Sequence, residues 1–167
     1  MEMLMKMKEH GMIRIELFPD LAPVAVKSLN RLVSKGKYDG RAIERLEPDF
    51  VIQPLFQDGK DPEIDQMIEP EFRTRQDNHS YPFGRGVVAM AGDESFASGS
   101  QFFICLKERD YLQGNFTVIG KVVSGWEEIE RLEAVEVDAF LDKESGRIYH
   151  VPKEKHVVET IEIIDER

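Results

Sequence analysis

Alternating apolar and polar residues predict β-strands along most of the chain. In the segment Met12–Leu17, aliphatic side chains fall on one face and charged side chains on the other, which is the period of a strand with one buried face. Other segments either repeat this period or are short runs of β-branched and aromatic residues between turn signals. We therefore expect further strands at residues 1–8, 41–46, 50–53, 87–91, 102–106, 117–123 and 157–164.

Two segments show the helical period instead. Between Pro23 and Gly36, apolar residues recur every three or four positions. Proline is favoured in the first turn of a helix and glycine just after the last one, so the ends of this helix are also marked. Trp126, Ile129 and Leu132 lie at three-residue spacing among charged residues. They predict a second amphipathic helix.

The order of these elements predicts the fold class. Many short strands, with helices only at the margins, favour a mainly β protein with a closed or nearly closed antiparallel sheet, because closure removes exposed strand edges. We expect one domain over residues 1–167. The segment between Val137 and Lys155 is expected to be a polar loop with a short hairpin around Ser145-Gly146.

Composition is that of an ordinary soluble globular protein. The chain has 167 residues, of which 41% are hydrophobic and 32% are charged, and this length suffices for a core without disulfides. The net charge of −10 opposes nucleic-acid binding, which needs basic surfaces. No stretch approaches a transmembrane helix, and the Met-rich start alternates with charges unlike a secretory signal. We expect no membrane association and a cytoplasmic location.

No metal or cofactor is expected. The acidic residues between Asp58 and Asp65 are close in sequence, but their spacing differs from that of a calcium-binding helix-loop-helix and favours a solvated acidic loop. His150 and His156 lack the spacing of a zinc site. The single cysteine, Cys105, lies within an apolar strand and is expected to be a buried structural thiol.

The central stretch Val87–Leu112 carries the candidate chemistry. Its two apolar segments predict a hairpin whose connecting loop, Gly92–Ser100, is longer than usual, and such loops are uncommon without a function. Side chains alternate along a strand, so Gln101 and Phe103 share one face and Phe102 points to the other. One face of the hairpin can therefore offer an apolar surface with an amide beside it.

Several segments, in the right order and at compatible spacing, resemble the cyclophilin family of peptidyl-prolyl cis/trans isomerases. The family's F-H-R-x-x-x-x-F-M-x-Q segment corresponds to Ile43–Gln53, and its G-S-Q-F-F-I run is identical to Gly99–Ile104. Met90-Ala91 precedes the loop as in the family, and Leu112 matches the leucine of its W-L-D-G segment. The similarity extends over about residues 12–123.

This resemblance implies a closed eight-stranded antiparallel β-barrel capped by two α-helices, with an exposed groove that holds proline. Arg45 is similar to the family's catalytic arginine, and Gln53 is placed to fix its guanidinium. The residues that carry over as substrate-binding are Phe50, Val51, Ala91, Gly92, Gln101, Phe103, Tyr111, Leu112 and Phe116.

The chemistry of the reaction agrees with this set of residues. Rotation about a peptide bond breaks amide resonance, at a barrier of ~18–20 kcal/mol. As the bond twists, the prolyl nitrogen becomes pyramidal and regains its lone pair. A permanently charged guanidinium aimed at that nitrogen stabilises the twisted amide more than either planar form, without any cofactor. We expect a monomer whose partners are proline-containing peptides and unfolded protein chains.

The chain also departs from the family pattern. Ile43-Glu44 stands in place of F-H, which adds an acid beside Arg45, and Pro54–Asp58 replaces a glycine-rich segment. Phe116 takes the place of a pocket histidine, and Gly92 that of a frequent asparagine. Tyr111 replaces the tryptophan associated with tight cyclosporin binding, so weak binding of cyclosporin is the expectation.

Two other functions are compatible with the sequence. A weakly catalytic module that binds proline peptides, or acts like a chaperone, is favoured by Glu44, Gly92 and the altered Pro54–Asp58 segment. An acidic interaction scaffold with a vestigial groove is the second, and it predicts no binding of proline peptides. Turnover and peptide titration separate the three.

Overall fold

One antiparallel sheet forms most of the protein. The computed structural model describes residues 1–54 and 61–166. The main sheet contains β1 (Glu2–Met7), β2 (Met12–Leu17), β3 (Arg45–Glu47), β4 (Val51–Gln53), β5 (Met67–Ile68), β6 (Val87–Gly92), β7 (Ala97–Cys105), β8 (Val118–Ser124) and β11 (Val158–Ile164). A separate sheet pairs β9 (Val137–Leu141) with β10 (Ile148–Pro152). The helices are α1 (Pro23–Ser34), α2 (Glu71–Thr74), α3 (Gln76–His79), α4 (Trp126–Glu133) and the 3₁₀ helix η1 (Asp110–Leu112).

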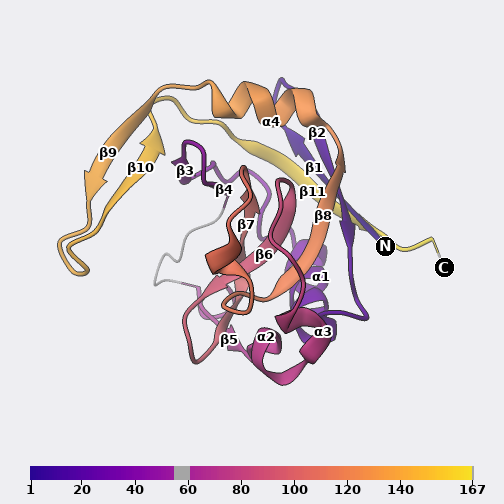
Figure 1. The fold of residues 1–167 in the computed structure, drawn as a ribbon. Coiled ribbons are helices and arrows are strands. Elements are labelled where there is room, and N and C mark those ends of the chain that lie inside the picture. The colour runs from indigo at the N-terminus through magenta and orange to yellow at the C-terminus, as the bar shows by residue number, and fades with distance from the viewer. Residues whose placement is uncertain (55–60, 167) are drawn as a thin grey trace.

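The main sheet curls into a barrel that its regular strands do not fully close (Figure 1). Its path runs β11-β1-β2-β8-β6-β7-β4-β3, with β5 paired to β7. The edge strands β3 and β11 do not pair directly, and residues 40–43, before β3, join them: Ala42 forms an isolated bridge with Val157, the Ile43 N–H donates to the His156 carbonyl at 2.8 Å, and Val158 bonds with Gly40 and Arg41. We call these contacts the seam.

The sequence led us to expect a fully closed eight-stranded barrel, and the structure corrects this expectation. The fold is mainly β and antiparallel, as expected, but the strand predicted at residues 41–46 shortens to β3. The predicted strand is interrupted because residues 40–43 hydrogen-bond to the start of β11 and the residues before it, whereas residues 45–47 pair with β4. The seam replaces the missing strand pairing.

The inward faces of the first strands show why the alternating pattern folds this way. Met3 and Met5 on β1 are fully buried, and they lie opposite Ile15 and Ile13 on β2. Each such side chain contributes about 1.5–3 kcal/mol by leaving water. The strands predicted from the alternation of residues 1–17 are confirmed.

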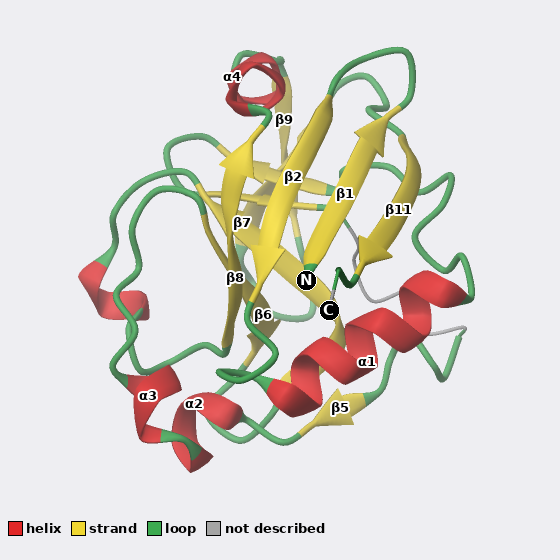
Figure 2. Ribbon diagram, turned by 90° about the vertical axis from the view of Figure 1, so that its right-hand side faces the viewer, coloured by secondary structure: helices red, strands yellow, loops and turns green. Residues whose placement is uncertain are grey.

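Two helices lie at opposite ends of the barrel, as Figure 2 shows for α1 and α4. α1 begins at Pro23 and buries Leu29 and Leu32 against the core, whereas α4 buries Ile129 and Leu132. The two predicted helices are confirmed. Among the helices of the described residues, none combines the length and apolar character needed to cross a membrane.

The β6–β7 hairpin separates the two hydrophobic clusters that the described residues form. Phe102 belongs to the cluster inside the barrel, and Phe103 belongs to a smaller cluster on the other side of the sheet. The predicted alternation is thus confirmed. The expected long loop is wrong, because Ala97–Ser100 already belong to β7 and the turn covers only residues 93–96.

The strands β9 and β10 form a hairpin that stands away from the barrel (Figure 1). We call residues 137–152 the hairpin arm. Its root is anchored by Val137, which packs against the barrel core, and by Pro152, which is buried. Two five-residue strands thus replace most of the polar loop expected here, while the hairpin turn itself includes Ser145 and Gly146 as predicted.

Candidate active site

A cavity of about 200 Å³ opens on the side of the sheet that carries the smaller hydrophobic cluster. Its walls come from β3, β4, β6, β7, η1 and the hairpin arm. The described residues that line it are Arg45, Phe50, Val51, Gln53, Ala91, Gly92, Phe103, Leu112, Phe116 and Arg147. The structure thus brings together all of the predicted site residues except Gln101 and Tyr111.

Aromatic and aliphatic side chains form the apolar part of this cavity. Phe103 is 5% exposed and meets Phe116 edge to face, with 5.4 Å between the ring centroids. Val51 and Leu112 are also buried in the cluster that contains Phe103. Because these side chains are held by β4, β7 and η1, their positions are fixed before any ligand arrives. The cavity is a preformed apolar pocket.

Arg45 and Gln53 are direct cross-strand partners, since β3 pairs with β4 in this register. Their expected proximity is confirmed. The amide of Gln53 donates to Oε1 of Gln101 at 3.0 Å, and this pair is buried. The hydrogen bond to the guanidinium that the sequence assigned to Gln53 comes instead from Glu47, whose Oε1 accepts from Nε of Arg45 at 3.2 Å.

Glu47 is the residue that the sequence analysis missed in this part of the site. Its carboxylate accepts from the backbone N–H of His150 at 2.8 Å and from Nδ1 of the same residue at 2.7 Å. Burial of Glu47 raises its pKa. The hydrogen bonds from His150 and Arg45 together lower it by more than burial raises it, so the pKa of Glu47 lies below the ordinary value. Glu47 is therefore an ionised carboxylate that holds Arg45 and the hairpin arm together.

The two predicted residues outside the cavity lie next to it. Gln101 is 9% exposed and stands behind Gln53 as its hydrogen-bond acceptor. Tyr111 is 63% exposed, and its ring lies 6.4 Å from that of Phe50 at the rim. Gln101 thus supports a wall of the cavity, and Tyr111 extends its outer edge.

The departures from the family pattern fall in different places. Ile43 is buried in the barrel core. Glu44 lines a separate cavity of about 860 Å³ between the hairpin arm and residues 40–44, so it belongs to a different surface from the groove beside Arg45. At Gly92, an added Cβ would come within 2.4 Å of the Phe96 carbonyl oxygen. The tight turn at residues 93–96 therefore requires glycine there. The altered segment Pro54–Asp58 lies outside the described residues from position 55 onward.

Arg147 is the cavity residue that sequence reasoning did not find. It follows the turn of the hairpin arm and is exposed. The mostly apolar run Val137–Leu141 was the available signal for a strand, but no local pattern reveals that the arm reaches this groove. Arg147 therefore belongs to the site through tertiary structure alone.

Candidate metal ligands do not gather in the described ranges 1–54 and 61–166. No group of three or more His, Cys, Asp or Glu side chains is placed there to hold a metal ion. Asp61 and Glu63 form ion pairs with Lys37 and Lys35, while Asp58 lies outside the described residues. Burial raises the pKa of Cys105 to about 12, which keeps the thiol protonated and unreactive.

Known proteins of one family match this chain over most of its length. The sequence model of the cyclophilin type peptidyl-prolyl cis-trans isomerase/CLD family matches residues 2–163. A probable peptidyl-prolyl cis-trans isomerase of Brucella suis is 34% identical over 141 residues, which cover 78% of this chain and 70% of that protein. Peptidyl-prolyl cis-trans isomerase-like 1 of Rhizopus delemar is 30% identical over 153 residues, covering 92% and 90%.

A solved structure supports the same conclusion at the level of the fold. The crystal structure of a cyclophilin type peptidyl-prolyl cis-trans isomerase of Cryptosporidium parvum, determined in the presence of the dipeptide Ala-Pro, aligns with a TM-score of 0.78. It is 23% identical, and the alignment covers 99% of this chain and all of the other. From the extent of the family match together with these relatives, the chain belongs to the cyclophilin type peptidyl-prolyl cis-trans isomerase family.

Proposed function

We propose that this chain accelerates cis/trans rotation about X–Pro bonds in peptides and unfolded protein chains, with Arg45 acting on the twisted amide. The observation that carries the proposal is the guanidinium of Arg45 at the wall of a preformed apolar cavity. Crystallisation of the Cryptosporidium parvum relative in the presence of Ala-Pro supports the same class of ligand. No covalent step is required.

The two halves of the cavity have different tasks in this proposal. Phe103, Leu112 and Phe116 hold the pyrrolidine ring by apolar contact, so that the preceding carbonyl swings while the ring stays fixed. Arg45 then interacts with the prolyl nitrogen, whose lone pair is available only in the twisted amide. Such an interaction favours the transition state over both planar ground states, and it therefore increases the rate.

In this proposal, Glu47 limits the motion of the Arg45 side chain. A fixed donor avoids the reorganisation that a loose side chain needs at the moment of reaction. The ion pair with Glu47 leaves the guanidinium charged, because arginine does not lose its proton in proteins. Glu47 is therefore a positioning residue.

The decisive experiment is the cis-to-trans rate of an Ala-Pro test peptide with wild type, Arg45→Ala and Arg45→Lys. Loss of a preorganised donor costs about 10²–10³-fold in rate, and we expect Arg45→Ala to fall within or near this range. Chemical denaturation of each variant controls for folding, and NMR titration shows whether the peptide still binds. An unchanged rate in Arg45→Ala would contradict the proposed role.

The weakly catalytic binding module is favoured by one observation. The ion pair with Glu47 reduces the positive field that Arg45 presents to the cavity. A protein of this kind binds proline peptides with the same residues but gives little acceleration. Wild type that binds the test peptide without increasing its rate would move the chain to this class.

Finer parts of the proposal concern partners and setting. We propose a monomer in the cytoplasm that binds cyclosporin weakly. The first part rests on the expectation drawn from the family resemblance, and the second on composition. The third rests on Tyr111, which occupies the rim where the family has a tryptophan. Sedimentation velocity, localisation of a tagged protein and cyclosporin titration test the three parts separately.

A further inference from the structure

The turn of the hairpin arm holds the backbone of Arg147 in a defined place. The carbonyl of Arg147 accepts from the Asp142 N–H at 2.9 Å, and its own N–H donates to Oγ of Ser145 at 3.3 Å. Gly146, just before it, has a φ of 71° and closes the turn through a bond to the Asp142 carbonyl. The side chain of Arg147 therefore starts from an ordered turn.

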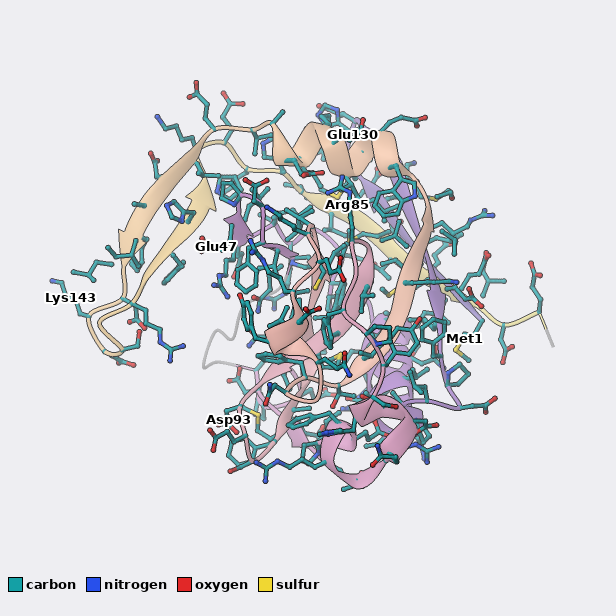
Figure 3. The ribbon with its side chains drawn as sticks, in the orientation of Figure 1. Met1, Glu47, Arg85, Asp93, Glu130 and Lys143 are labelled. Atoms are coloured by element: carbon teal, nitrogen blue, oxygen red, sulfur yellow. The ribbon has the colours of Figure 1, made fainter. Side chains whose placement is uncertain are left out.

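The arm itself is anchored to β3, the strand that carries Arg45 and Glu47. His150, three residues after Arg147, is bonded to Glu47 through both its backbone and its ring. Because Glu47 also accepts from Arg45, one carboxylate fixes the positions of both elements that carry the cavity's arginines. Figure 3 shows Glu47 between the arm and the barrel.

The charge of the cavity is opposite to that of the whole chain. Among the described residues that line it, Arg45 and Arg147 are cationic and none is acidic, although the chain carries a net charge of −10. The Arg45 guanidinium has Glu47 as a partner. Within the described residues, the Arg147 guanidinium forms no ion pair or hydrogen bond of its own. It is therefore a cation available to a ligand in the groove.

We propose that Arg147 forms a subsite for an anionic side chain next to the proline of the substrate. A planar guanidinium binds a carboxylate or a phosphate through paired, charge-assisted hydrogen bonds. The subsite deepens the proposed function, on which it rests, by naming a substrate class: X–Pro sequences with an acidic or phosphorylated neighbour. A lysine at the same place in the substrate is disfavoured by like charge.

The test compares peptides that differ only in charge. Glu-Pro and Gln-Pro peptides are isomerised by wild type, Arg147→Gln and the control Lys143→Gln, and the Glu/Gln ratio of kcat/KM is measured. Lys143 lies at the outer end of the same arm (Figure 3) and does not line the cavity. We expect a preference of about 2- to 5-fold for Glu-Pro, the range of an ion pair with an exposed arginine.

This preference should disappear in Arg147→Gln, persist in Lys143→Gln, and weaken as salt is added. A second series with Glu after the proline locates the subsite on one side of the bond, and phosphoserine-Pro against serine-Pro distinguishes phosphate from carboxylate. Affinities from NMR titration provide a readout that needs no turnover.

Absence of acceleration for every peptide would contradict the proposed function. The subsite would be contradicted if wild type isomerised and bound Glu-Pro and Gln-Pro peptides equally well. A Glu/Gln ratio that is the same in wild type and Arg147→Gln would also contradict it.

Discussion

Glu47 accepts two hydrogen bonds from His150, one from the backbone N–H at 2.8 Å and one from ring Nδ1 at 2.7 Å. A carboxylate can only accept, so the ring nitrogen that faces it carries a proton. The same carboxylate accepts from Nε of Arg45. The site therefore depends on an ionised residue that sequence comparison with the family motif did not single out.

Replacement of Glu47 by glutamine should affect both stability and rate. The change leaves His150 and Arg45 without their charged partner, and lost hydrogen bonds to a charged group cost about 1–3 kcal/mol. We expect a lower free energy of unfolding by this amount and a slower isomerisation rate. Chemical denaturation and the peptide assay measure the two effects. Glu136→Gln is the matched control, because Glu136 is 82% exposed in its pair with Lys153. It should change stability by less than about 0.5 kcal/mol.

Acid should remove the contribution of Glu47 to stability. Burial opposes ionisation of Glu47, yet its hydrogen bonds prevail and keep its pKa below the ordinary value of 4.5. A carboxyl group whose pKa is lower in the folded state stabilises the fold above its unfolded-state pKa, and it loses that contribution as the pH falls through the folded-state pKa. The stability difference between wild type and Glu47→Gln should thus be largest near neutral pH and shrink below about pH 4. A difference that stays constant from neutral to acid would rule this out.

Phe116→Ala should weaken substrate binding more than the chemical step. Phe116 packs edge to face on Phe103 and forms one wall of the apolar pocket, so its loss reduces contact with planar and twisted prolines alike. Uniform loss of binding raises KM and leaves kcat nearly unchanged. We expect KM to rise by about tenfold, equivalent to about 1.4 kcal/mol. Phe96 is a residue that is 42% exposed and does not line the cavity, so Phe96→Ala should leave KM unchanged. A fall in kcat alone would contradict this role for Phe116.

Tyr111→Trp should increase the affinity for cyclosporin. Tyr111 is exposed beside Phe50 at the rim, and a larger indole offers more apolar area and a ring N–H donor at that position. Intrinsic fluorescence titration of the two proteins measures the change, with Ala-Pro peptide turnover as a check that the groove is intact. Equal affinities would show that the rim residue does not limit cyclosporin binding.

Local sequence pattern predicted the parts of the fold that have one buried face. Met12–Leu17 became β2 with its predicted boundaries, and Phe102 and Phe103 entered different clusters because neighbouring strand residues point in opposite directions. The register that pairs Arg45 with Gln53 follows from two short strands around a turn. These features depend on residues that are close in sequence.

Elements that lack one clearly buried and one clearly exposed face were missed or misplaced by the sequence pattern. Ala97–Ser100 looked like a loop because small residues carry little strand signal, yet Gly99 lies so close to α1 that an added Cβ would come within 2.9 Å of Ser28 Oγ. The arm exposes Phe140 and Ile148, so its apolar residues do not mark a buried side. The contact between Glu47 and His150 joins positions 103 residues apart. Close packing and long-range pairing of this kind are properties of the folded chain.

The position of the hairpin arm has an evolutionary consequence. Val137 and Pro152 are cross-strand neighbours at its root. The two points at which the arm joins the barrel are therefore adjacent, whatever the length of the hairpin between them. The cost of closing a loop grows only slowly with its length. Exchange of the arm between relatives, or grafting of a designed hairpin, can therefore change the charge beside the groove while the register of every barrel strand is kept. If Arg147 forms the proposed subsite, the link between α4 and β11 carries a determinant of substrate preference that lies outside the barrel strands.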